Sequence, residues 1–125
     1  MGRKFKIPYD TRGGVCVLSR QMLNHENYLT LPAQAKVLIL LLHEQWRDEK
    51  EVDYGIREAS EKIPCSRPTA MKAFRQLEER EFIHKVSESL FSSRVESKTR
   101  TWRLTWMPFL SKKPTGEWEN WIDEN

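Results

Sequence analysis

The segment from Ile56 to Val86 most constrains the fold, because prolines and a serine divide it clearly into separate elements. Pro64 stops a first helix over 56–63. Ser66 is a good N-cap for a second helix over 67–80, with Pro68 in its first turn, where a missing N–H costs nothing. The apolar residues of this second helix recur every three or four positions, at Ala70, Ala73, Phe74 and Leu77. The pattern therefore predicts two helices joined by a tight turn and followed by a strand over 82–86.

From Arg67 to Arg75, the remaining sides of the second helix are rich in hydrogen-bond donors and hold no carboxylate. Its N-terminus and the hydroxyls of Ser66 and Thr69 suit a phosphate. Arg67, Lys72 and Arg75 can reach base edges or phosphates, and Met71 can meet a thymine methyl in a major groove. The alternative is an ordinary solvated amphipathic helix. The predicted DNA-contacting residues of this helix are Ser66, Arg67, Thr69, Met71, Lys72 and Arg75.

The strongest helical pattern upstream runs from Pro32 to Asp48, with Thr30 or Leu31 at its cap. Apolar side chains occupy nearly every side of this helix, which predicts a central helix buried almost all round. Shorter elements are expected as well: a helix from Arg20 to about His25 capped by Ser19, and strands over 15–18 and 52–54.

Downstream, Thr101–Trp106 alternates like a strand that pairs antiparallel with 82–86. Trp102, Leu104 and Trp106 should lie on one face, opposite Thr101, Arg103 and Thr105. The connection over 87–100 carries a modest positive excess, which suits phosphates or a minor groove. A solvated hairpin tip fits its charge equally well. The candidate contacts in this loop are Arg94, Lys98 and Arg100.

The order helix, helix, strand, helix, helix, strand, long loop, strand resembles that of winged helix-turn-helix proteins. SRPTAMKAFRQLEEREFI (66–83) is similar to the Ser-x-x-Thr-x-x-Arg-x-Leu-x-x-Leu-Glu-x-x-Gly-x-Ile pattern of bacterial winged-helix regulators. Lys72 stands where Arg is common. The positive charge is kept, but an ammonium cannot make the two parallel hydrogen bonds of a guanidinium. Glu81 replaces the usual Gly, so the helix must end without the easy left-handed residue. LPAQAKVLILLL (31–42) and WRLTWMP (102–108) resemble segments of winged-helix proteins from phages, prophages and plasmids.

This resemblance implies an α+β fold, mainly α with a small antiparallel sheet, of the winged helix-turn-helix type. It implies a sequence-specific, double-stranded DNA-binding transcriptional regulator of bacterial, phage or mobile-element type. Because symmetric DNA sites favour two-fold proteins, we also expect a homodimer, and we expect no cofactor. One alternative is initiation of phage or plasmid replication through the same contacts. Another, of a different class, is a winged-helix protein-interaction module that docks through Trp118 and Trp121.

Charge divides the chain into three expected regions: a basic arm over 1–14, a DNA-binding domain over 15–110 and an acidic tail over 111–125. The formal net charge of +3 becomes +7 when residues 117–125, which hold four acidic and no basic side chains, are left out. A polyanionic partner fits this body. The basic arm, with Arg3, Lys4, Lys6 and Arg12, could follow a neighbouring groove or simply be solvated. Trp118, Trp121 and Ile122 could form a short docking helix or belong to a frayed end.

The sequence contains only incomplete motifs for catalysis or metal binding. We therefore expect that the protein is not an enzyme and has no catalytic residue and no metal site. His43-Glu44-Gln45-Trp46-Arg47 begins like HExxH but has Arg47 in place of the second His, and we expect His43 on the helix surface. Cys16 and Cys65 have no metal-ligand spacing, and Cys65 fits better as a small turn filler than as a redox sensor. Without an apolar signal or a membrane span, a cytoplasmic, nucleoid-associated protein is expected.

Overall fold

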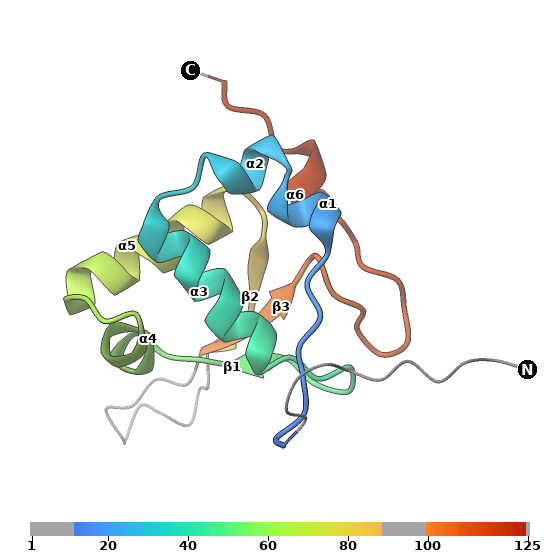
Figure 1. Ribbon diagram of the computed structural model, residues 1–125, viewed down its shortest axis with the longest axis horizontal. Helices are drawn as coiled ribbons and strands as arrows, with labels where there is room; N and C mark the ends of the chain where they lie inside the picture. The colour runs from blue at the N-terminus through green and yellow to red at the C-terminus, as the bar shows by residue number, and fades with distance from the viewer. Residues whose placement is uncertain (1–11, 89–99, 125) are drawn as a thin grey trace, which may run out of the picture.

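The computed structural model describes residues 12–88 and 100–124, which form helices around one small sheet (Figure 1). The α+β class with a small antiparallel sheet is confirmed. The helices and strands are, in chain order, α1 (Arg20–Leu23), α2 (Glu26–Leu29), α3 (Ala33–Glu44), β1 (Val52–Asp53), α4 (Ile56–Lys62), α5 (Arg67–Glu79), β2 (Ile83–Glu88), β3 (Arg100–Leu104) and α6 (Glu117–Asn120).

The sheet is antiparallel and has the order β1-β3-β2, so β3 is the central strand. Val52 of β1 lies opposite Trp102 of β3, and Ile83 of β2 lies opposite Leu104. The side chain of Trp102 is 1% exposed, and its Nε1 donates to the Tyr54 carbonyl over 3.0 Å. The predicted strands over 52–54, 82–86 and 101–106 are therefore present, with small differences at their ends.

The second predicted helix of the 56–86 segment is confirmed as α5. Ser66 is its N-cap, and its Oγ accepts a hydrogen bond from the Thr69 N–H. The four apolar residues that define the helical period are its buried face: Ala70, Ala73, Phe74 and Leu77. The Phe74 ring stacks on Trp102 with 5.2 Å between centroids, so this face fixes α5 to the central strand.

The C-terminus of α5 turns through a left-handed residue that is not glycine. Glu81 has φ 62°, its N–H donates to Glu78, and the Phe82 N–H donates to the Leu77 carbonyl. These two bonds form a Schellman motif, in which the left-handed position favours Gly. The departure seen at Glu81 in the sequence is thus accommodated at an energetic cost, because a side chain there crowds its own carbonyl.

Replacing Glu81 with Gly should stabilise the protein. The change removes the left-handed strain but adds chain entropy to the unfolded state, so we expect a gain of about 0.5–1 kcal/mol in the free energy of unfolding. Glu79→Gly is the matched control, since Glu79 is also exposed but helical, and it should lose about 0.5–1 kcal/mol. Urea unfolding of the three proteins measures both changes. A loss of stability in Glu81→Gly would contradict the strain argument.

The central helix α3 is shorter and more exposed than predicted. Pro32 occupies its N-cap in place of Thr30 or Leu31, and it ends at Glu44, well before Asp48. It is not buried all round, because its outer face is uncovered by the other described elements and Leu40 is 41% exposed. The buried side chains of α3 are Ala35, Leu38, Ile39, Leu42 and His43.

Near the N-terminus, the prediction of a strand over 15–18 is wrong, since this segment pairs with no strand in the described chain. The helix expected from Arg20 to about His25 is present as α1, which Ser19 caps as predicted and which ends at Leu23. A second short helix that was not predicted follows it. His25 is the N-cap of the second, α2, where its Nδ1 accepts from the Asn27 N–H over 3.0 Å. His25 thus interrupts the helix that its neighbours begin.

The C-terminal segment packs on the body of the protein. Trp118 of α6 is 4% exposed, stacks on Phe82 with 5.3 Å between centroids, and meets the His25 ring edge-on. The Asn27 side-chain amide donates to the carbonyls of Trp118 and Trp121 over 2.8 and 2.9 Å. The region over 111–125, expected as a separate acidic tail, therefore contributes to the core. Of the two outcomes considered for it, the docked helix is correct in part, because α6 contains Trp118 but ends before Trp121, and Ile122 is 75% exposed.

Two contacts of polar side chains also hold this segment. The Arg80 guanidinium lies over the Trp121 ring, 4.4 Å from its centroid. His84 of β2 lies 3.1 Å from the Glu117 carboxylate. Burial raises the pKa of Glu117, but hydrogen bonds from the Thr115 side chain, its own backbone and His84 outweigh burial and hold it below its ordinary value. A carboxylate at this position therefore stays ionised and attached to the sheet.

The expectation for Thr105 is also wrong. The strand ends at Leu104, so the alternation of faces stops before Thr105, and this side chain turns inward. Its hydroxyl donates to the Glu81 carbonyl over 2.8 Å, and its N–H donates to Phe82 over 2.9 Å. Thr105 is completely buried as a result, and it connects the end of β3 to the turn after α5.

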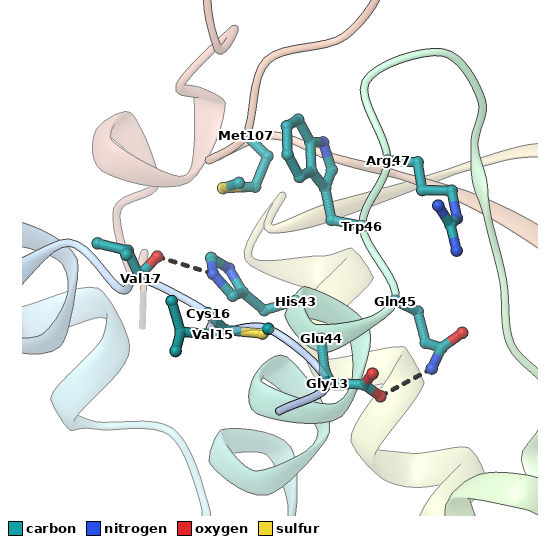
Figure 2. Close-up of a pocket in the computed structure, with 11 residues that line it drawn as sticks. Gly13, Val15, Cys16, Val17, His43, Glu44, Gln45, Trp46, Arg47 and Met107 are labelled. Atoms are coloured by element: carbon teal, nitrogen blue, oxygen red, sulfur yellow. Dashed lines mark hydrogen bonds between the residues drawn. The ribbon is translucent and has the colours of Figure 1, made fainter. Parts of the chain in front are cut away.

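His43 is buried, contrary to the prediction of a surface position on α3. Its Nδ1 accepts from the Trp106 indole N–H over 3.0 Å, which leaves Nε2 to donate to the Val17 carbonyl over 2.9 Å. Figure 2 shows this carbonyl turned toward the imidazole, at the edge of a hollow between the N-terminal segment and the end of α3. Burial lowers the pKa of His43, against an opposing effect of the Val17 carbonyl. The neutral imidazole thus ties residue 17 to the core.

Candidate nucleic-acid interface

The turn between α4 and α5 presents the N-terminus of α5 at the surface. Ile63 and Cys65 are half-buried and pack against the core on either side of the exposed Pro64. The Cys65 N–H donates to the Ser60 carbonyl over 2.8 Å, which closes the turn. The packed position of Cys65 agrees with the interpretation of this thiol as a small residue that fills the turn.

The outer face of α5 is open to solvent. Arg67, Lys72 and Arg75 are all exposed, and Met71 between them is 40% exposed. None of the three cations forms an ion pair with another residue in the described ranges. Their charges are therefore available to an external anion, which is the arrangement predicted from the sequence.

Nearby carboxylates on α4 are neutralised within their own helix. Lys62 binds Glu58 at 3.0 Å, and Arg57 lies 3.4 Å from Glu61, both pairs at a spacing of four residues. The first turn of α5 itself holds no acidic residue. The N-terminal half of α5 consequently presents positive charge without a compensating carboxylate beside it.

The extreme N-terminus of α5 offers fewer free donors than expected. Pro68 has no N–H, and the Thr69 N–H is already bound to the Ser66 Oγ. Ser66 also donates its hydroxyl hydrogen to the Thr69 Oγ1 over 2.9 Å, so that the Thr69 hydroxyl is the one left to donate outward. The groups that this end can offer to a phosphate are therefore mainly the Arg67 side chain and the Thr69 hydroxyl.

A polar hollow between α5 and the start of α3 adds two residues that the sequence analysis missed. Gln34 of α3 and Gln76 of α5 line it together with Pro32, Thr69 and Lys72. An amide can both donate and accept, so it can bind a base edge or a phosphate. Gln34 precedes α5 by more than thirty residues, and only the packing of α3 against α5 brings it to this surface.

The predicted loop contacts are described only in part. Arg94 and Lys98 lie outside the described residues. Arg100 is half-exposed at the start of β3, where its carbonyl accepts from the Tyr54 N–H over 3.3 Å. In the predicted basic arm, Arg3, Lys4 and Lys6 also lie outside the described residues. The structure thus places the six predicted residues at α5 on one surface with the neighbouring glutamines. Contacts by the loop over 87–100 and by the N-terminal arm stay predictions.

Within residues 12–88 and 100–124, no group of three or more His, Cys, Asp or Glu side chains is placed to hold a metal ion. No helix in the same ranges is both long and apolar enough to cross a bilayer. Comparison of the chain with protein-family models, curated proteins and solved structures finds no match.

Proposed function

We propose that this protein is a winged helix-turn-helix protein that binds double-stranded DNA sequence-specifically and regulates transcription, with α5 in the major groove. The element order from α3 to β3 supports this proposal, because α4 and α5 form the helix pair and β2 and β3 form the hairpin of such a domain. The pairing of β1 with β3 completes a three-stranded sheet on which these helices pack.

The observation that carries the proposal is the unpaired cationic face of α5. Arg67 and Arg75 lie on the same helix face, and both can reach base edges or the flanking backbone when the helix enters a groove. Met71 between them offers an apolar contact to a thymine methyl. Even Arg75, which has Glu79 four residues further along α5, forms no ion pair within the described residues, so its charge remains available to a phosphate.

The alternative of a protein-interaction module is less well supported. Trp118 is buried in its own chain, so its indole is not presented to a partner. The Trp121 ring is half-buried and already in contact with the Arg80 guanidinium. Replication initiation would use the same contacts on α5 and differs only in the location of the DNA site. Repeated sites beside an origin would identify that role.

Selection of bound duplexes from a random pool, followed by fluorescence anisotropy at low salt, tests the proposal. Arg67→Ala and Arg75→Ala should each weaken binding to the selected site by about 1–3 kcal/mol, which is about 5- to 150-fold. Arg20→Ala is the matched control, since Arg20 is an exposed helical arginine outside α5, and it should bind like the unmodified protein. Failure to select any duplex, or equal affinities in all four proteins, would reject DNA binding through this face.

A further inference from the structure

The outer face of α3 carries an apolar stripe that no other described element covers. Ala33, Val37 and Leu40 follow one another at spacings of four and three residues, and Glu44 comes four residues later. This is the spacing of a helix–helix seam. Ala33 is exposed, Leu40 is 41% exposed and Val37 is half-buried. Single exposed apolar residues are common on protein surfaces, but a regular stripe on one helix is not.

We infer that this stripe is the interface of a two-fold homodimer, in which α3 packs antiparallel against α3 of a second copy. A two-fold axis that passes between Val37 and Leu40 places Val37 of each copy opposite Leu40 of the other copy. The apolar centre of the interface is therefore self-complementary. The same axis places Ala33 opposite the partner's Glu44. One surface therefore serves both copies.

The charges of α3 favour this pairing over others. In the antiparallel arrangement Lys36 of one copy, whose ammonium lies 5.8 Å from the Tyr28 ring centroid of its own chain, is also on the side of the partner's Glu44. The two-fold axis repeats this pairing at the other end of the interface. Glu44 also approaches the N-terminus of the second α3, whose cap residue Pro32 provides no side-chain hydrogen bond. A parallel pairing would instead bring like charges together, Lys36 to Lys36 and Glu44 to Glu44, which is unfavourable.

The antiparallel dimer also fixes how the two copies of α5 are oriented. The meaning of this orientation for DNA binding rests on the proposed function. α5 packs against α3 (Figure 1). It lies on the flank that includes Gln34, which is one residue after Ala33 and so about a quarter turn around the helix from the stripe. A two-fold axis perpendicular to two antiparallel helices keeps corresponding flanks on the same side of the pair. Both α5 helices then lie on one side of the dimer, as binding to a palindromic DNA site requires.

Sedimentation velocity of the full chain without DNA, over a micromolar concentration series, tests the dimer independently of DNA binding. The unmodified protein should shift from monomer to dimer, and Leu40→Glu should remain monomeric because it places two charges in the apolar centre. Leu110→Glu is the control, since Leu110 is 55% exposed outside α3, and it should dimerise normally. Circular dichroism shows whether each variant is folded.

A charge exchange tests the antiparallel register. Lys36→Glu and Glu44→Lys should each weaken the dimer at least tenfold, and the double variant should recover most of the loss. A monomer at every concentration would reject the inference. A dimer that survives Leu40→Glu would place the interface elsewhere, and an unrecovered double variant would reject the antiparallel pairing. If deleting residues 1–11 is needed before the chain dimerises, the occupant of the stripe is that segment of the same chain.

Discussion

Trp118→Ala should lower the free energy of unfolding by about 3–5 kcal/mol, the range for removing a large aromatic side chain from a core. The indole is 4% exposed and stacks on Phe82, and its loss would leave a cavity between α6 and the sheet. The Asn27 amide would also lose its well-placed carbonyl partners if α6 moved away. Urea or thermal unfolding measures the change. A domain of this size can lose half of its stability in this way.

Ile122→Ala provides the control for this prediction. Ile122 lies four residues further along the same segment and is 75% exposed, so its truncation should change stability by less than about 0.5 kcal/mol. Should Trp118→Ala be equally neutral, the C-terminal segment would not be part of the folded body. The protein-interaction alternative would then regain support, because the indole would be available to a partner.

The triple variant of Arg67, Lys72 and Arg75 to Ala should abolish measurable site-specific binding. At about 1–3 kcal/mol for each contact, the combined loss is at least a hundredfold. The dependence of affinity on salt separates the kinds of contact. Each lost phosphate contact should reduce the slope of log K against log salt by about 0.9, whereas a lost base contact should leave the slope unchanged.

A second triple variant, of Arg20, Lys112 and Lys113 to Ala, removes the same formal charge from exposed positions outside α5. It should retain site-specific binding, with only a small uniform loss from the lower net charge. Equal losses in the two triple variants would show that the overall charge of the protein attracts DNA and that α5 is not the reading element.

The helices and strands that repeat a clear pattern could be predicted from the sequence. α5 combines a serine cap, a proline in the first turn and an apolar face over three turns, and each feature is local. The direction of its cationic face follows from the same periodicity. α2 could not be predicted in this way, because four residues cannot show a helical period and its cap is a histidine.

The missed features depend on contacts between distant parts of the chain. His43 is buried because Trp106 and Val17 bind its two ring nitrogens, and neither partner is near it in sequence. Trp118 enters the core through Phe82 and Asn27 in the same way. The sequence left open whether Trp118 docks or belongs to a frayed end, because its contacts lie far away along the chain and the buried indole stabilises the segment only through them.

The bond between His43 and the Val17 carbonyl gives the N-terminal residues a fixed point of departure. Because Nδ1 of His43 accepts from the Trp106 indole, only the neutral imidazole can make this bond and the bond to Trp106 together. The backbone of the segment before α1 is therefore attached to the core through one uncharged ring.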